Sequence, residues 1–120
     1  MSDRVIALET ILDLDRLTDM SQERPVLIYK HSTACPICAR TYRLYHDLAE
    51  SDTSNPAPFF AELFVIENRE VSDDIETRFS VRHQTPQLLL LKAGEAVWDS
   101  SHFDITEDAI AIALDATSTD

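Results

Sequence analysis

The chain has 120 residues, of which 44% are hydrophobic, and its 22 acidic and 10 basic residues give a formal net charge of −12. This length supports one hydrophobic core and leaves no room for a second, so we expect a single domain over residues 1–120. The strong negative charge repels phosphate backbones and anionic lipids, which argues against nucleic acid and membranes as partners.

The N-terminus lacks the basic and apolar regions of a secretory signal, and no apolar run reaches the roughly 20 residues of a membrane span. We therefore expect a cytoplasmic protein. The surface is rich in Asp, and the only lysines are Lys30 and Lys92. This composition fits a salt-adapted cytoplasm and an ordinary acidic protein about equally well.

The hydrophobic pattern alternates between strand and helix spacing along the chain. Asp13 and Ser72 are the expected helix starts in the N-terminal and middle parts, and Thr106 is the expected cap of the last helix. The tail at 116–120 is expected to be frayed. The predicted strands cover 5–8, 26–30, 62–67, 88–91 and 96–98, and the predicted helices follow Asp13, start at Pro36, start at Ser72 and follow Thr106.

The only two cysteines, Cys35 and Cys38, form a Cys-Pro-Ile-Cys motif between a buried strand and a helix. This spacing in this context is typical of a redox pair. Pro36 suits the first helical position, which places Cys35 at or just before the helix N-terminus, where unpaired N–H groups favour a thiolate. We therefore predict Cys35 as the nucleophile and the more buried Cys38 as the resolving thiol.

The alternatives for this pair are zinc ligation and a structural disulfide. Structural zinc needs four ligands, and the chain has no second cysteine pair and only scattered histidines, so we expect no metal and no bound cofactor. A disulfide closing so small a loop would constrain the unfolded chain little. In a reducing cytoplasm a cysteine pair is more often catalytic than structural.

The segment Thr85-Pro86 opens the apolar run at 88–91. Proline removes a hydrogen-bond donor from a sheet and is tolerated at the first residue of a strand, so we predict a cis Thr85–Pro86 bond facing Cys35. The backbone before a cis-proline can align a disulfide substrate by strand-like hydrogen bonds.

Other polar residues are weaker candidates for the site. His31, four residues before Cys35, can stabilise a thiolate or shuttle protons, although simple hydrogen bonding at a strand end is the plainer interpretation. Arg82 and His83 can line a substrate groove, and Arg40 can reach a carboxylate on a small thiol. Surface solvation is the simpler interpretation of each of these three residues.

The element order is strand-helix-strand-helix-strand-helix-strand-strand-helix, which predicts an α/β protein with a central mixed β-sheet flanked by helices. The Cys-Pro-Ile-Cys helix start, the Thr-Pro pair and the Lys-x-Gly hairpin occur in an order that resembles the thioredoxin fold. General thioredoxins carry a buried Asp six residues before the first cysteine, where this chain has Tyr29. Deprotonation of Cys38 would then depend on water, Tyr29 or His31.

Four segments resemble a narrower group, the monothiol bacilliredoxin family of the bacillithiol system. They are 30–37 (KHSTACPI), 68–72 (NREVS), 81–87 (VRHQTPQ) and 98–106, which runs from Trp98 to Thr106. The resemblance implies reduction of mixed disulfides between S-thiolated proteins and bacillithiol, a low-molecular-weight thiol, with Cys35 attacking. Many members have Ser where this chain has Cys38, which leaves open whether the cycle uses one thiol or two.

Two other functions remain open at this stage. One is a general protein disulfide reductase coupled to a flavin-dependent reductase. The other is a thioredoxin-like module that holds a metal or an iron–sulfur cluster.

Overall fold

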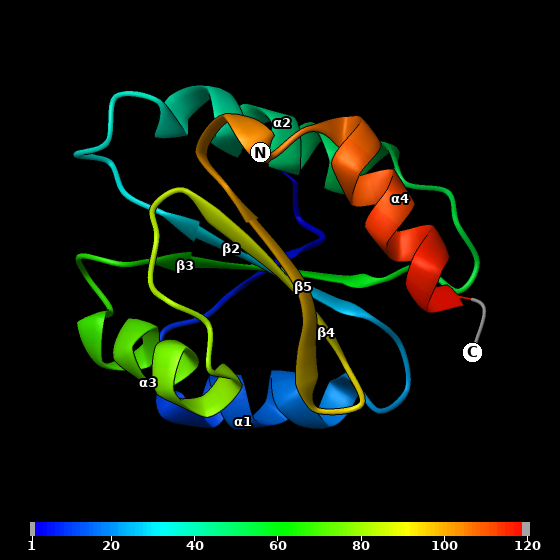
Figure 1. Cartoon of the computed structure of the whole chain (residues 1–120), viewed down its shortest axis with the longest axis horizontal. Helices are drawn as coiled ribbons and strands as arrows, with labels where there is room; N and C mark the ends of the chain where they lie inside the picture. Colours follow the sequence, from blue (N-terminus) through cyan, green and yellow to red (C-terminus); the bar gives the residue numbers. More distant parts are fainter. Residues whose placement is uncertain (1, 119–120) are drawn as a thin grey trace.

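The computed structural model describes residues 2–118 as a five-stranded sheet between two layers of helices (Figure 1). The strands are β1 (Val5–Ala7), β2 (Val26–His31), β3 (Phe59–Phe64), β4 (Gln87–Lys92) and β5 (Glu95–Ser101). The helices are α1 (Ile11–Met20), α2 (Cys38–Ser51), α3 (Arg69–Phe79), the short 3-10 helix η1 (His102–Asp104) and α4 (Glu107–Ser118).

The sheet has the strand order β1-β3-β2-β4-β5. Strands β1, β3 and β2 run parallel, whereas β4 runs antiparallel to β2 and β5 antiparallel to β4. The central strand β2 is buried along its whole length, which explains its almost unbroken apolar run. The predicted α/β class and the mixed sheet flanked by helices are confirmed.

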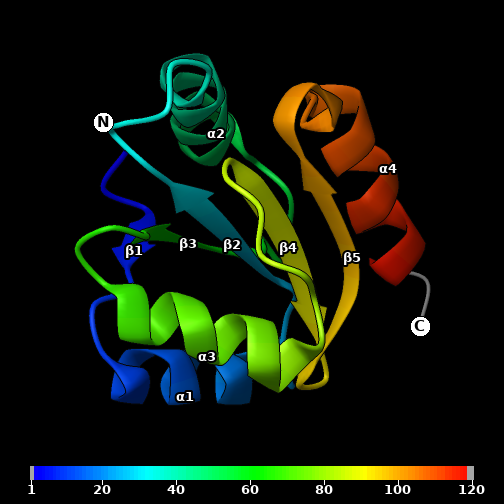
Figure 2. The same cartoon turned by 60° about the vertical axis from the view of Figure 1, so that its left-hand side comes forward.

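Two hydrophobic cores lie on the two faces of the sheet. Helices α1 and α3 cover one face, and α2 and α4 cover the other (Figure 2). Because side chains alternate along a strand, Val26 and Ile28 of β2 enter the α1/α3 core, and Leu27 and Tyr29 enter the α2/α4 core. None of the helices in residues 2–118 is long and apolar enough to cross a membrane.

The predicted starts of the third strand and the third helix are each wrong by three residues. The third strand begins at Phe59 and not at residue 62, because Phe60 and Ala61 pair with both β1 and β2, which only the assembled sheet brings together. Helix α3 begins after Asn68, and Ser72 is a buried residue inside it whose N–H donates to the Asn68 carbonyl.

The ends of α1 and α4 also differ from prediction. The N-cap of α1 is Thr10, whose hydroxyl accepts from the Asp13 N–H while the Asp13 carboxylate accepts from the Thr10 N–H, so Asp13 closes a capping box and does not itself start the helix. Thr106 caps α4 as predicted. Helix α4 runs to Ser118, so residues 116–118 of the predicted tail are helical, and 119–120 lie outside the described residues.

Candidate active site

Cys35 lies in the loop that follows the central strand, and Cys38 is the first residue of the helix after it. Two turn hydrogen bonds shape this loop: the Cys35 N–H donates to the Ser32 carbonyl at 3.2 Å, and the Cys38 N–H donates to the Cys35 carbonyl at 3.2 Å. The second bond spans three residues and closes a tight turn through Pro36 and Ile37. Helix α2 therefore begins at Cys38, two residues later than predicted, with Ile37 as its N-cap.

The two thiols differ in their surroundings. Both are free, and Cys35 is partly exposed whereas Cys38 is fully buried. Burial, together with the neighbouring Cys35 side chain, raises the pKa of Cys38 to about 11. Cys38 is therefore a neutral thiol near pH 7. The expected contrast in exposure is confirmed, and the assignment of Cys35 as the nucleophile stays a prediction.

The Tyr29 hydroxyl is the polar group of β2 that reaches this pair. Its oxygen lies 3.3 Å from the Cys38 carbonyl oxygen and 3.1 Å from His31 Nδ1. Burial raises the pKa of Tyr29, and the nearby Cys38 adds to this, so the hydroxyl keeps its proton and acts as a donor. Burial lowers the pKa of His31, which leaves a neutral imidazole beside that hydroxyl.

His31 is buried among aromatic rings. Its ring centroid lies 4.6 Å from that of Tyr42 and 5.2 Å from that of Phe64. Within residues 2–118, no hydrogen bond joins the imidazole to either sulfur, and its hydrogen-bond partner is Tyr29. His31 is thus placed to act on the cysteines through Tyr29 and not directly.

The aromatic cluster continues to a second histidine. Tyr42 stacks on His46 with ring centroids 4.3 Å apart, and His46 Nε2 lies 2.6 Å from Glu62 Oε1. This pair was not predicted as part of the site. Among the described residues, no group of three or more His, Cys, Asp or Glu side chains is arranged to hold a metal ion.

The predicted cis bond at Thr85–Pro86 is present. Pro86 immediately precedes β4, and β4 pairs antiparallel with β2 in a register that sets Lys30 opposite Gln87. The start of β4 and the end of β2 therefore lie at the same end of the sheet. Pro86 and the cysteine loop are both at this end. A second cis bond, Asn55–Pro56, was not predicted and lies in the connection from α2 to β3.

Lys30 is a buried charged residue that the sequence reasoning missed. Its side chain is fully buried, and Nζ lies 2.6 Å from His83 Nδ1 and 3.0 Å from Gln87 Oε1. Burial lowers the pKa of Lys30 to about 8. Burial and the neighbouring Lys30 also lower the pKa of His83. A lysine inside an otherwise buried strand was the sequence signal that could have identified this contact.

Gln87 connects Lys30 to the segment before the cis-proline. Its Oε1 atom also accepts from the Gln84 N–H at 3.2 Å, and its Nε2 atom donates to the Arg82 carbonyl at 3.0 Å. The Arg82 side chain itself is exposed, so this residue enters the network through its backbone.

Of the candidate substrate-binding residues, His83 and Thr85 contact each other, with His83 Nε2 3.3 Å from Thr85 Oγ1. Both precede Pro86 in the same segment. His83 and Thr85 thus lie together immediately before Pro86, while the hydrogen-bond partner of His31 is Tyr29, whose side chain lies in the α2/α4 core.

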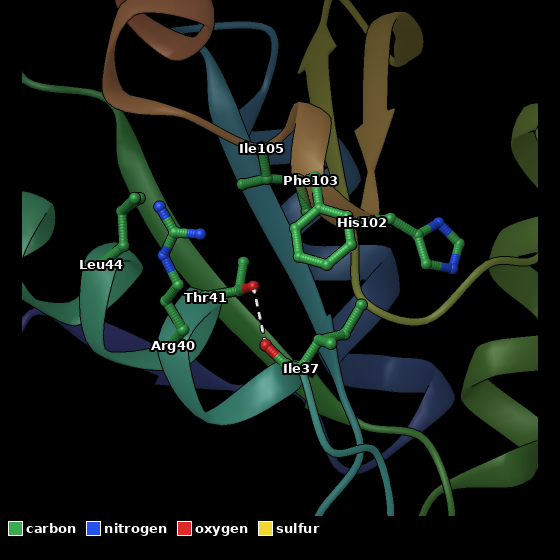
Figure 3. A pocket seen from close by; sticks show the side chains of 7 residues that line it. All are labelled: Ile37, Arg40, Thr41, Leu44, His102, Phe103 and Ile105. Atoms are coloured by element: carbon green, nitrogen blue, oxygen red, sulfur yellow. Dashed lines mark hydrogen bonds between the residues drawn. The ribbon is translucent and has the colours of Figure 1, made fainter.

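A small groove runs beside α2, next to the cysteine loop (Figure 3). Its volume is about 90 Å³, and it is lined by Ile37, Arg40, Thr41, Leu44, His102, Phe103 and Ile105. A larger cavity of about 610 Å³ lies around Pro25 and Lys92, at the opposite end of strands β2 and β4. Neither cysteine lines this cavity.

A partly exposed and a buried cysteine at the start of a helix, with a cis-proline at the same end of the sheet, define a thiol-disulfide oxidoreductase of the thioredoxin fold. A solved structure described as a putative oxidoreductase with a thioredoxin fold is 31% identical, covers 91% of this chain and 92% of its own, and has a TM-score of 0.78. The chain belongs to the monothiol bacilliredoxin BrxC family, whose profile matches residues 6–110.

Two thioredoxins show the same fold at lower identity. The Fasciola hepatica thioredoxin is 21% identical, with coverage of 93% of this chain and 98% of its own and a TM-score of 0.74. A mutant thioredoxin from Halobacterium salinarum is 20% identical, with coverage of 97% and 93% and a TM-score of 0.72. The resemblance to the bacilliredoxin family and the thioredoxin-like fold are thus confirmed, together with a role in thiol redox chemistry.

Proposed function

We propose that this protein reduces mixed disulfides between proteins and a bacillithiol-type small thiol, with Cys35 as the nucleophile and Cys38 as the resolving thiol. The observation that carries the proposal is a partly exposed thiol three residues before a buried thiol of raised pKa, in a chain of the bacilliredoxin family. The proposal assigns the protein to the cytoplasm, where a reducing pool keeps such thiols active.

In the first step, the Cys35 thiolate attacks the sulfur of the small thiol in the mixed disulfide. A new disulfide forms between Cys35 and the small thiol, and the target protein leaves as a thiolate that takes a proton from water. The backbone of Thr85 and Pro86 would align the substrate, with His83 and Arg82 beside it.

In the second step, Cys38 attacks the Cys35 sulfur and releases the small thiol. The product is a Cys35–Cys38 disulfide, which two electrons from further small thiol or from a flavin-dependent reductase would return to two thiols. Cys38 must first lose its proton. The Tyr29 hydroxyl can donate a hydrogen bond to the resulting thiolate, and the neutral His31 beside it can accept a proton.

Single-turnover mass spectrometry on a protein substrate carrying bacillithiol tests this sequence of steps. The Cys38→Ser variant should strip the substrate and accumulate a Cys35 adduct, whereas Cys35→Ser should leave the substrate intact. The wild-type protein should finish with an internal disulfide, seen as the loss of two hydrogens. A Cys35→Ser variant that strips the substrate at the wild-type rate would overturn the proposal.

The second cysteine favours one alternative, a general protein disulfide reductase, because reducing a protein disulfide requires a resolving thiol. The two functions differ in substrate preference. Reduction of an ordinary protein disulfide faster than the small-thiol mixed disulfide would support this alternative.

A further inference from the structure

The groove beside α2 has mostly apolar walls and one cationic group. Leu44 lies on α2, Ile37 is the N-cap of α2, and Phe103 lies on η1. The Thr41 hydroxyl donates a hydrogen bond of 3.3 Å to the Ile37 carbonyl. Figure 3 shows these side chains between α2 and the η1 segment. Ile37 immediately precedes Cys38, so the end of the groove that it forms is the end nearest to the two cysteines.

Arg40 supplies the cationic group of this groove and has no anionic partner. In residues 2–118 its guanidinium makes no ion pair or hydrogen bond, whereas Arg78 pairs with Asp15 and Asp74. The first turn of α2 also carries no acidic side chain. Arg40 is an exposed residue, so its guanidinium at the rim of this mostly apolar groove is free to pair with an anion from solvent.

The η1 wall of the groove is joined to the cis-proline. The His102 N–H donates to the Pro86 carbonyl at 3.1 Å, and Ser101 pairs with Gln87 at the end of β5. His102 has a φ of 55°, and the turn it makes leads directly to Phe103, which is 71% exposed at the groove. An exposed aromatic ring beside a candidate site offers an apolar surface on which a ligand can pack.

We propose that this groove binds the carboxylate-bearing part of the small thiol that becomes attached to Cys35. The planar guanidinium of Arg40 would pair with the carboxylate, and the Phe103 ring would cover the carbon skeleton. A volume of about 90 Å³, well below the roughly 300–1,000 Å³ of a site for a drug-sized ligand, suits a fragment of a small molecule and not a protein segment. This inference rests on the proposed function, which assigns the sulfur that becomes bonded to Cys35 to the small thiol.

The test measures an exchange equilibrium at Cys35 in a Cys38→Ser background. The Cys35 thiol reacts with one glutathione disulfide to give the Cys35–glutathione mixed disulfide and one glutathione, so thiols and disulfides balance. The same equilibrium is measured with glutathione ethyl ester, in which the carboxylates are blocked. We expect the acid to form the adduct about tenfold more favourably than the ester, a modest effect for a hydrogen bond to a charged group.

Substitution of Arg40→Gln should bring this acid-to-ester ratio close to one. Arg43→Gln is the matched control. It removes the same charge from the same helix, and Arg43 does not line the groove. Phe103→Ala should weaken the acid and ester adducts alike. Each variant's circular dichroism spectrum establishes that it folds.

An acid-to-ester ratio that is unchanged by Arg40→Gln, or lowered equally by Arg43→Gln, overturns the inference. A stronger dependence on Arg40 for the adduct with coenzyme A, whose anionic groups are phosphates, overturns the assignment to a carboxylate. The equilibrium requires no protein substrate, so it still reports on the groove if Cys35 fails to strip a thiolated protein. The two proposals can therefore fail separately.

Discussion

A buried thiol with a pKa of about 11 is a poor nucleophile at neutral pH, because only a small fraction of it is thiolate. The Tyr29 hydroxyl, whose oxygen lies 3.3 Å from the Cys38 carbonyl oxygen, acts in the opposite direction and lowers the pKa of Cys38. Burial keeps the Tyr29 hydroxyl protonated and His31 neutral, so the pair forms a donor beside a proton acceptor. Tyr29 occupies the position at which general thioredoxins carry a buried Asp, and His31 is hydrogen-bonded to it.

Tyr29→Phe should slow the resolving step and leave the first step unchanged. Loss of the hydroxyl raises the pKa of Cys38, so less thiolate is present at pH 7 and decay of the Cys35 adduct should slow by roughly two- to threefold, a fraction of the tenfold effect of one pKa unit. The rate should rise with pH in both proteins, with the variant's rise displaced to higher pH. Mass spectrometry of the adduct against time, from about pH 6 to 10, measures this.

Tyr42→Phe is the control for this experiment, since Tyr42 packs on the same His31 ring from α2. It should leave the decay of the adduct and its pH profile unchanged. Equal decay rates in Tyr29→Phe and the wild-type protein would show that Tyr29 has no part in the resolving step.

A buried lysine of strand β2 forms hydrogen bonds with the first residue of β4 and with the segment that precedes it. Lys30 binds His83 and Gln87, and Gln87 in turn binds the backbone of residues 82 and 84. Because burial lowers the pKa of Lys30 to about 8, its charged form disfavours the folded state. The connection that fixes the cis-proline segment therefore depends on pH.

Lys30→Met should remove one pH-dependent term from the free energy of unfolding. Between pH 8 and 10.5 the unfolded lysine holds more protons than the folded one, so this term stabilises the wild-type fold as pH rises, by up to about 1.4 kcal/mol per unit. Urea denaturation at several pH values in this window, under reducing conditions, gives the difference between wild type and variant.

The other lysine provides the control, because Lys92→Met removes the same charge from β4. That variant should keep the wild-type pH dependence. A constant stability difference between Lys30→Met and wild type from pH 8 to 10.5 would contradict the assignment.

The sequence predicted the features of the site that depend on local chemistry. The cysteine pair, the cis bond at Pro86 and the cap at Thr106 each follow from residue types a few positions apart. Lys30 and His83 are 53 residues apart, and only the pairing of β2 with β4 brings them together. The start of the third strand at Phe59 was placed three residues too late for the same reason, since the partners of this strand lie on β1 and β2.

At the scale of the whole molecule, the net charge of −12 opposes compaction through mutual repulsion. Arg78 forms ion pairs with Asp15 and Asp74, but the 10 basic residues are far outnumbered by the 22 acidic ones. The basic side chains are therefore too few to offset the repulsion among the carboxylates.

Sodium chloride should therefore raise the thermal unfolding midpoint. Screening shortens the Debye length from roughly 10 Å at 0.1 M to about 3 Å at 1 M, which removes most of the repulsion between surface carboxylates. We expect an increase of several degrees, most of it below about 0.5 M, measured by circular dichroism. Glucose at the same osmolarity is the control, and an unfolding midpoint that falls with added salt would contradict this expectation.

The sheet order also bears on how the chain folds. The cysteine loop follows β2, which forms its parallel pairs with β3 and β1 inside residues 5–64, but the cis-proline arrives only with β4. Joining Lys30 to Gln87 closes a loop of 57 residues, and such long closures slow folding. The two sides of the candidate site thus meet only when the distant halves of the chain dock, and a fragment that ends before β4 would carry both thiols without the segment proposed to position their substrate.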